Sequence, residues 1–178
     1  MIEIKILAIS STIFISIFSL ITILNFFYPS NFIGRFFINN LNINRNVLFY
    51  CFLLSLIGTL SSLYLSEIKN LEPCKYCWFE RIFLFPLVII YITTYFRKDK
   101  NGIFISLPFI LIGISISVYH YFIQWFPGDD SCDLVNCSSP YIWELGFISI
   151  PLMAFFNFFG LLLIIINQKI LCKWKNIS

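Results

Sequence analysis

Charged side chains are scarce in this sequence. Asp, Glu, Lys and Arg make up only 12% of the 178 residues, against roughly a quarter in soluble domains, while 59% of the residues are hydrophobic. This shortage excludes an ordinary soluble domain, and a net charge of only +3 gives no support to nucleic-acid binding. Polar stretches long enough for a separate globular domain are also lacking. The sequence therefore predicts a single all-α integral membrane protein.

Windows of about 20 largely apolar residues, the length needed to cross a hydrocarbon core of about 30 Å, occur five times in the chain; four are uncharged, and the third carries Glu80 and Arg81 near its start. The five predicted spans run from Ile6 to Tyr28, between Arg45 and Glu67, from Cys77 to Arg97, from Ile103 to Phe126 and from Leu145 to Asn167. The first is too long for the apolar region of a signal peptide and lacks an obvious small-residue cleavage site, so we count it as a span.

Lys and Arg gather on one side of these spans. Short loops rich in them stay in the cytoplasm, and here they are the connector 29–46, the turn around Arg97 and the C-terminal tail. The other side receives the loops 66–76 and 127–144, the second with four acidic residues and no Lys or Arg. We therefore expect a multi-pass protein of the bacterial plasma (inner) membrane, with both loops and the N-terminus outside and the C-terminus inside. Lys5 opposes an outer N-terminus; if the first segment instead lies along the membrane, the other four spans keep their orientation.

The six cysteines divide along the same line. The cytoplasmic ones are Cys51 and Cys172, and the four outer ones form two close pairs, Cys74 with Cys77 and Cys132 with Cys137. Because extracytoplasmic compartments are oxidising and the cytoplasm is reducing, only the outer pairs are expected to take part in disulfide chemistry.

The first outer pair, Cys74 and Cys77, stands at the predicted start of a membrane helix. Two intervening residues allow an easily reduced small-ring disulfide, and the amides of a helix N-terminus stabilise a thiolate. A purely structural disulfide is poorly motivated, because so small a ring restricts little chain entropy. A zinc site would need further Cys or His ligands, and the one histidine, His120, is expected within a span. A redox-active dithiol is therefore favoured, and no metal is expected.

The second pair, Cys132 and Cys137, encloses four residues in an acidic, turn-rich loop. A disulfide that only clips the loop is the simpler alternative. Two pairs on one face of the membrane can, however, exchange electrons by thiol–disulfide exchange. We therefore favour a redox role for this pair as well.

Polar residues near the outer ends of the spans are candidates for an acceptor site. Arg81 follows Cys77 by four residues, which is about 6 Å along a helix and on the same face. It can stabilise a thiolate or hold an oxygen-bearing aromatic head group, or it can contact lipid phosphate or pair with Glu80. His120 and Gln124 are expected at a similar depth, where a neutral histidine hydrogen-bonded between helices is the alternative.

Four segments together resemble the DsbB family of disulfide-bond formation proteins, in particular its BdbC-type branch. They are SLYLSEI at 62–68, PCKYCWFERI at 73–82, YHY at 119–121 with Gln124, and the pair Cys132–Cys137. The resemblance covers residues 48–166. It implies a four-helix transmembrane bundle within 47–178, to which residues 1–46 add an N-terminal transmembrane helix and a basic connector that the four-span pattern lacks.

The resemblance also implies an enzyme, a thiol:quinone oxidoreductase. Such a protein reoxidises a thioredoxin-like extracytoplasmic thiol oxidase of the DsbA or BdbD kind and passes the electrons to membrane ubiquinone or menaquinone. Cys132 and Cys137 would oxidise this partner through a mixed disulfide on Cys132. Cys74 and Cys77 would then oxidise that pair, with Cys77 as the thiolate facing the quinone. The residues expected to bind the quinone are Arg81, Glu80, His120 and Gln124.

Three other functions remain open at this point. A vitamin K epoxide reductase type enzyme has its helix-mouth pair after the loop pair, the reverse of the order here. A CcdA-like transmembrane electron conduit would need cysteines buried within spans. A structural membrane protein with loop-pinning disulfides is distinguished from the enzymes by whether the pair Cys74–Cys77 is easily reduced.

Overall fold

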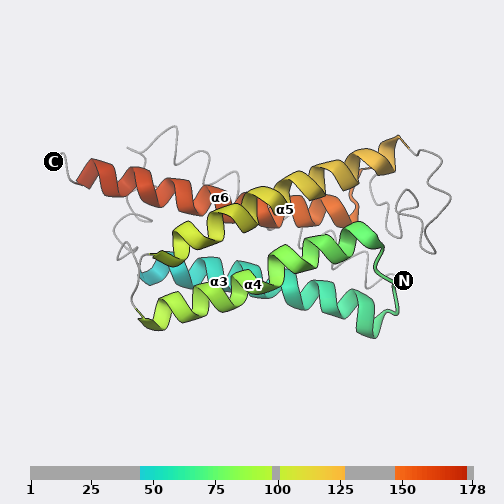
Figure 1. The fold of residues 1–178 in the computed structure, drawn as a ribbon, viewed down its shortest axis with the longest axis horizontal. Helices are drawn as coiled ribbons and strands as arrows, with labels where there is room; N and C mark the ends of the chain where they lie inside the picture. The colour runs from blue at the N-terminus through green and yellow to red at the C-terminus, as the bar shows by residue number, and fades with distance from the viewer. Residues whose placement is uncertain (1–44, 98–100, 127–146, 176–178) are drawn as a thin grey trace.

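The computed structural model describes residues 45–97, 101–126 and 147–175, and the regular elements in these ranges are helices (Figure 1). They are the α-helices α3 (Arg45–Leu63), α4 (Lys75–Arg97), α5 (Asn101–Trp125) and α6 (Ile150–Lys175), with a π-helical turn, η1 (Tyr64–Ile68), that continues α3.

The four long helices form a closed bundle. Each packs against the next in the sequence, and α6 returns to pack against α3 (Figure 1). The interior contains Leu87, Tyr91, Ile110, Phe158 and Leu161, none of which has any exposed surface. The predicted all-α bundle of four helices is thus confirmed for the described residues.

Large hydrophobic side chains also cover the outside of the bundle. Leu60, Ile89, Phe104 and Phe122 are each more than half exposed. A helix that is apolar on its outer as well as its inner face suits a lipid environment. Within the described residues, three segments are long and apolar enough to cross a membrane, Val47–Ile68, Lys75–Arg97 and Gly102–Trp125, while the apolar stretch Ile150–Ile166 of α6 is shorter.

These segments agree with the second, third and fourth predicted spans. The last predicted span began at Leu145, whereas α6 begins at Ile150. Pro151 lies in its first turn, where a missing N–H needs no helical partner, so a proline there favours a helix start at this point. The first predicted span, 6–28, lies outside the described residues, and five spans therefore remain a prediction.

The link between α3 and α4 positions the start of α4. Asn70 has a positive φ of 52°, a conformation that Asn adopts more readily than most residues. The chain reverses there, and the Leu71 N–H bonds back to the Leu65 carbonyl at 3.1 Å. This tight return places Cys74, the residue before α4, beside the end of α5.

Candidate active site

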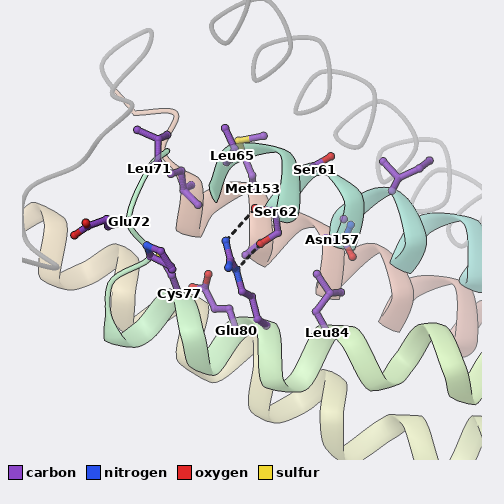
Figure 2. Close-up of a pocket in the computed structure, with 16 residues that line it drawn as sticks. Ser61, Ser62, Leu65, Leu71, Glu72, Cys77, Glu80, Leu84, Met153 and Asn157 are labelled. Carbon is purple, nitrogen blue, oxygen red and sulfur yellow. Dashed lines mark hydrogen bonds between the residues drawn. The ribbon is translucent and has the colours of Figure 1, made fainter. Parts of the chain in front are cut away.

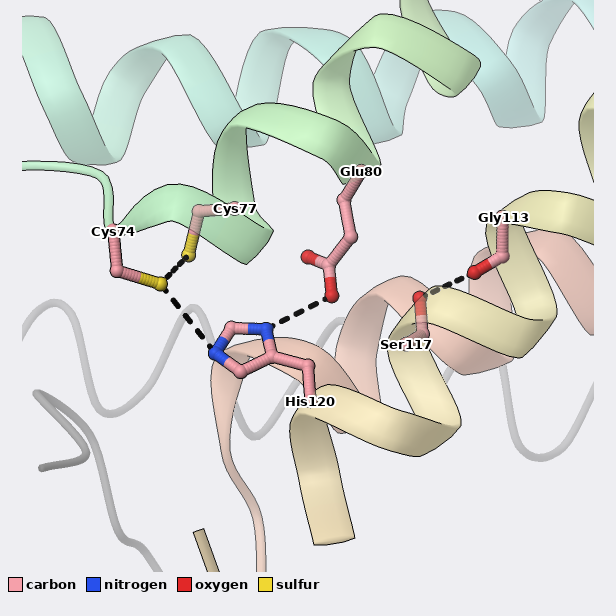
Figure 3. A network of polar contacts seen from close by, with 6 residues as sticks. All are labelled: Cys74, Cys77, Glu80, Gly113, Ser117 and His120. Carbon is pink, nitrogen blue, oxygen red and sulfur yellow. Dashed lines mark hydrogen bonds and ion pairs between the residues drawn. The ribbon is translucent and has the colours of Figure 1, made fainter. Parts of the chain in front are cut away.

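Cys74 and Cys77 lie at the N-terminus of α4. Cys74 directly precedes the helix, and its carbonyl accepts the N–H of Trp78 at 3.1 Å. Cys77 is the third residue of the helix, and the two Sγ atoms are 3.3 Å apart as free thiols (Figure 3). A disulfide needs an S–S distance of about 2.05 Å. A small movement therefore suffices to interconvert the dithiol and the disulfide.

His120 of α5 connects Cys74 to Glu80. Its Nε2 lies 3.5 Å from the Cys74 Sγ, and its Nδ1 lies 3.1 Å from Glu80 Oε1 (Figure 3). His120 is only 1% exposed and Glu80 6%. A carboxylate that accepts the Nδ1–H fixes the imidazole so that Nε2 faces the sulfur. A thiol, a base and a group that orients the base are the arrangement that activates a nucleophile.

The surroundings of Cys74 favour its thiolate. The hydrogen bond from the Cys77 thiol contributes most, the His120 side chain and the Cys77 backbone N–H add to it, and together they outweigh burial and lower the pKa of Cys74 to about 3. The backbone contribution is that of an N-cap position, where the side chain accepts the N–H of the third helical residue. In the dithiol state, Cys74 is therefore the cysteine whose surroundings favour a thiolate. A Cys77 thiolate belongs to a state in which Cys74 is bonded to another sulfur, and it remains a prediction.

Arg81 is held by the end of α3. Its Nε donates to Ser62 Oγ at 2.8 Å and its Nη2 donates to the Ser62 carbonyl at 2.9 Å. The guanidinium also lies 5.5 Å from the centre of the Trp78 ring, a cation–π distance. Glu80, the alternative partner of Arg81 in the sequence, faces His120 instead. The guanidinium is thus fixed in place, and two of its five donors are used by Ser62.

A cavity lies between α3, α4 and α6 beside this arginine (Figure 2). Together with the open space at its mouth, it measures about 860 Å³. Cys77, Glu80 and Arg81 line it. Its other walls are mainly apolar, with Ile57, Leu65, Leu71, Leu84, Ile150 and Met153 among them.

The structure brings only some of the predicted site residues to this cavity. Glu80 and Arg81 line it, whereas His120 contacts Cys74 and Glu80 from α5 and is not among the lining residues. Gln124 does not line it either, and its Oε1 is buried without a hydrogen-bond partner among the described residues. Both remain predicted quinone-binding residues.

The other cysteines are separate from this site or lie beyond the described side chains. Cys51 is buried in the first half of α3 with 1% exposure. Cys132 and Cys137 lie outside the described residues, as does the side chain of Cys172.

Two residues of the cavity are not among the site residues predicted from the sequence. Ser62 belongs to a segment that resembles the DsbB family, but its contact with Arg81 was not predicted. Asn157 of α6 also lines the cavity. An amide side chain in the middle of an apolar helix was the available signal, because polar side chains are rare within membranes and usually have a role there.

The two sulfurs and His120 Nε2 also lie within 4.8 Å of one another. The expectation that a histidine within a span cannot lie near the dithiol was therefore wrong. Its position in the span places His120 beside Cys74 and Cys77. Two thiolates and an imidazole are donors that zinc accepts. No fourth His, Cys, Asp or Glu joins this group in the part of the chain that the structure describes.

Comparison with known proteins agrees with the geometry. A family model described as "Disulfide bond formation protein DsbB" matches residues 44–168. The chain is 41% identical over 132 residues to a "Probable disulfide formation protein C" of Halalkalibacterium halodurans, covering 70% of this chain and 96% of the relative. It is 40% identical over 116 residues to a "Probable disulfide formation protein" of Chlamydia muridarum, covering 64% and 85%.

A third relative is the "SPbeta prophage-derived disulfide bond formation protein B" of Bacillus subtilis, 39% identical over 127 residues, with 67% of this chain and 86% of the relative covered. No solved structure gave a significant match. The extent of the family match and the high coverage of the relatives place the function in disulfide formation, rather than in a CcdA-like conduit or a purely structural protein. The chain belongs to the DsbB family of membrane disulfide-bond formation proteins.

Proposed function

We propose that this protein is a thiol:quinone oxidoreductase that oxidises a thioredoxin-like partner outside the cytoplasm and passes the electrons to quinone in the membrane. One observation carries this proposal: Cys77 belongs both to the dithiol and to the wall of the cavity. A molecule in the cavity is therefore in contact with the sulfur pair that loses electrons.

The cavity suits a quinone in the chemistry of its lining. Its apolar walls fit a hydrophobic ring, and the remaining donors of Arg81 can bind a ring oxygen. When bound, a quinone accepts two electrons and two protons and becomes a quinol. Ubiquinone and menaquinone both meet these requirements.

Residues next to the dithiol can accept the protons that its oxidation releases. Oxidation forms the Cys74–Cys77 bond, removes two electrons and releases two protons. His120 Nε2 holds the proton that Cys74 gives up when it becomes a thiolate, and the Glu80 carboxylate at Nδ1 stabilises the resulting imidazolium. Because Glu80 also lines the cavity, this pair connects the buried thiol to the space beside Arg81.

Cys132 and Cys137 would connect the dithiol to the soluble partner. The partner's dithiol reduces the Cys132–Cys137 disulfide through a mixed disulfide on Cys132, and the new thiols then reduce the Cys74–Cys77 disulfide by exchange. The loop that carries them begins after α5 ends at Trp125, at the end of the bundle where His120 meets Cys74. Cys132 follows Trp125 by seven residues, an extended reach of up to about 25 Å.

The dithiol and the quinone can be tested together in purified protein in lipid nanodiscs. With dithiothreitol as the thiol and a short-chain ubiquinone or menaquinone as the acceptor, quinone absorbance reports reduction. Cys77→Ser should abolish it. Cys51→Ala is the matched control and should keep the rate, because Cys51 is buried elsewhere in α3. A Cys77→Ser protein that reduces quinone at the wild-type rate would refute the proposal.

The soluble partner can be identified by trapping. A Cys137→Ser variant cannot complete the outer disulfide, so a mixed disulfide on Cys132 should accumulate and release a thioredoxin-like protein on reduction. Cys132→Ser is the control and should trap much less. Equal trapping by both variants would contradict the assigned order of attack.

A further inference from the structure

Asn157 is a buried amide whose oxygen has no hydrogen-bond partner in the described part of the chain. It lies on α6, is only 3% exposed and lines the cavity (Figure 2). Its Nδ2 donates to the Leu54 carbonyl of α3 at 3.1 Å. A carbonyl only accepts, so the amide nitrogen must face it and the amide oxygen must face elsewhere. That oxygen, Oδ1, has no hydrogen-bond partner among the described residues.

The position of this amide is fixed. A Cβ on Gly58 would come within 2.5 Å of Asn157 Nδ2, so the absence of a side chain at this position lets the amide approach α3. Gly58 precedes Ser62, the anchor of Arg81, by four residues, which is one turn or about 6 Å along the helix. Arg81, which carries further donors, and Asn157, whose Oδ1 is an acceptor, thus line the same cavity and lie against positions one turn apart on α3.

We infer that Asn157 Oδ1 accepts a hydrogen bond from a hydroxyl of the reduced ligand, so that the cavity binds a quinol more tightly than the quinone. This inference rests on the proposed quinone function. The oxygens of a quinone only accept, so they can bind Arg81 but offer nothing to Asn157. A quinol hydroxyl both donates and accepts and can satisfy both residues.

The preference has a consequence for the direction of electron flow. A site that binds the reduced form more tightly makes its bound quinone a stronger oxidant, and the equilibrium constant for oxidation of the dithiol rises by the ratio of the two affinities. Asn157 would therefore favour oxidation of the dithiol without touching either sulfur. A buried acceptor that gains its only partner on reduction corresponds to roughly a tenfold ratio.

Equilibrium binding tests the inference without turnover. Cys77→Ser protein in nanodiscs, which cannot transfer electrons, is titrated anaerobically with a short-chain 1,4-benzoquinone and with its quinol by calorimetry. The added change Asn157→Leu should weaken quinol binding about tenfold and leave quinone binding within about twofold. Thr59→Val is the control: its Oγ1 is also buried without a described partner, but Thr59 does not line the cavity, and both affinities should be unchanged.

The pattern of change separates recognition from packing. If Asn157 only anchors α6 to α3 through Leu54, its replacement should weaken quinone and quinol alike and lower the thermal midpoint. Should Asn157→Leu fail to fold, the ligand can be changed instead. The dimethyl ether of the quinol has no donor and should bind Asn157 protein about tenfold more weakly than the quinol. Equal binding of ether and quinol overturns the inference.

The outcomes also distinguish this inference from the function on which it rests. If wild-type protein reduces quinone but quinol and quinone bind equally, with or without Asn157, only the role of Asn157 is wrong. If neither ligand binds and wild-type protein reduces no quinone, both proposals are overturned.

Discussion

Cys74 depends on partners from two helices for its acidity. The Cys77 thiol, the larger cause, is a neighbour within α4, and His120 comes from α5. With a pKa of about 3, Cys74 is a thiolate across the physiological pH range. Because the thiolate is the reactive form in thiol–disulfide exchange, this geometry keeps the dithiol ready to react at neutral pH.

The rate of Cys74 alkylation against pH measures this directly. In wild-type protein, labelling followed at Cys74 by mass spectrometry should stay constant as the pH falls from neutrality, until the pH approaches about 3. Cys77→Ala removes the larger stabilisation of the thiolate, so its labelling should begin to fall at a higher pH. His120→Ala should shift the profile in the same direction but less far. A wild-type profile that falls just below the ordinary thiol pKa of about 8.5 would contradict the assignment.

Ser62 controls the position of Arg81. Ser62→Ala removes the acceptor of the Nε hydrogen bond and leaves the one from Nη2 to the backbone. We expect the KM for quinone to rise roughly fivefold with little change in kcat, since one hydrogen bond of about 1 kcal/mol is lost from binding. Ser66→Ala, one turn later and not lining the cavity, should leave KM unchanged. An unaltered KM in the Ser62 variant would show that Arg81 needs no such anchor.

Spacings within one helix could be predicted from the sequence, whereas contacts between side chains of different helices could not. The two-residue spacing of Cys74 and Cys77 and the four-residue step to Arg81 follow from the geometry of one helix. The contact of His120 with Cys74 joins residues 46 positions apart, and that of Asn157 with Leu54 joins residues 103 apart. Such contacts depend on how α3, α4, α5 and α6 pack, which local spacing does not determine.

At the contact of α5 with α6, Gly113 leaves no room for a side chain. A Cβ on Gly113 would lie 2.6 Å from the ring of Phe158, which is fully buried. The neighbouring Ser117 donates to the Gly113 carbonyl at 2.9 Å and thereby keeps this part of α5 compact (Figure 3). The glycine is therefore explained by close packing of the two helices.

Gly113→Ala should destabilise the protein by about 1–3 kcal/mol through overpacking. The sign of this change in stability is informative, because replacing Gly by Ala in an unconstrained helix stabilises the helix by about 1 kcal/mol. The midpoint of thermal unfolding in detergent is a suitable measurement. Ser115→Ala, on an exposed position of the same helix, should change it little. A higher midpoint for Gly113→Ala would mean that Phe158 can move aside.

The end of α4 was predicted correctly, because the charge of Arg97 marks it. The start of α6 was not: the predicted span begins at Leu145, whereas α6 begins at Ile150, with Pro151 in its first turn. The π-helical turn Tyr64–Ile68 had no such marker. Its hydrogen bonds differ from those of an α-helix by one residue, and turns of this kind often accompany functional sites. Here it begins two residues after Ser62, and its Leu65 lines the cavity.

At the scale of the whole molecule, the reactive groups gather at one end of the bundle. The start of α4 brings the dithiol, the last turns of α5 bring His120, and the segment 126–149 between α5 and α6 begins at this end. Tyr121 donates to the Phe147 carbonyl at 3.1 Å, which ties the two ends of that segment together. The segment that carries Cys132 and Cys137 therefore begins and ends at the end of the bundle where Cys74 and Cys77 lie. The proposed exchange between the two pairs requires this.

The side of the membrane on which this end lies can be tested by gene fusion and labelling. Loops with Lys and Arg stay in the cytoplasm, so alkaline phosphatase fused after Ser139 should be active and the same enzyme fused after Lys175 inactive. The reverse result would place the dithiol inside, where thiols are kept reduced, and would contradict its role in disulfide formation.

If residues 6–28 also span the membrane, the amino group of Met1 should react with an impermeant reagent in intact cells. Labelling only after permeabilisation would leave four spans, because the contacts of α3 with α4 and α6 close the bundle without that segment.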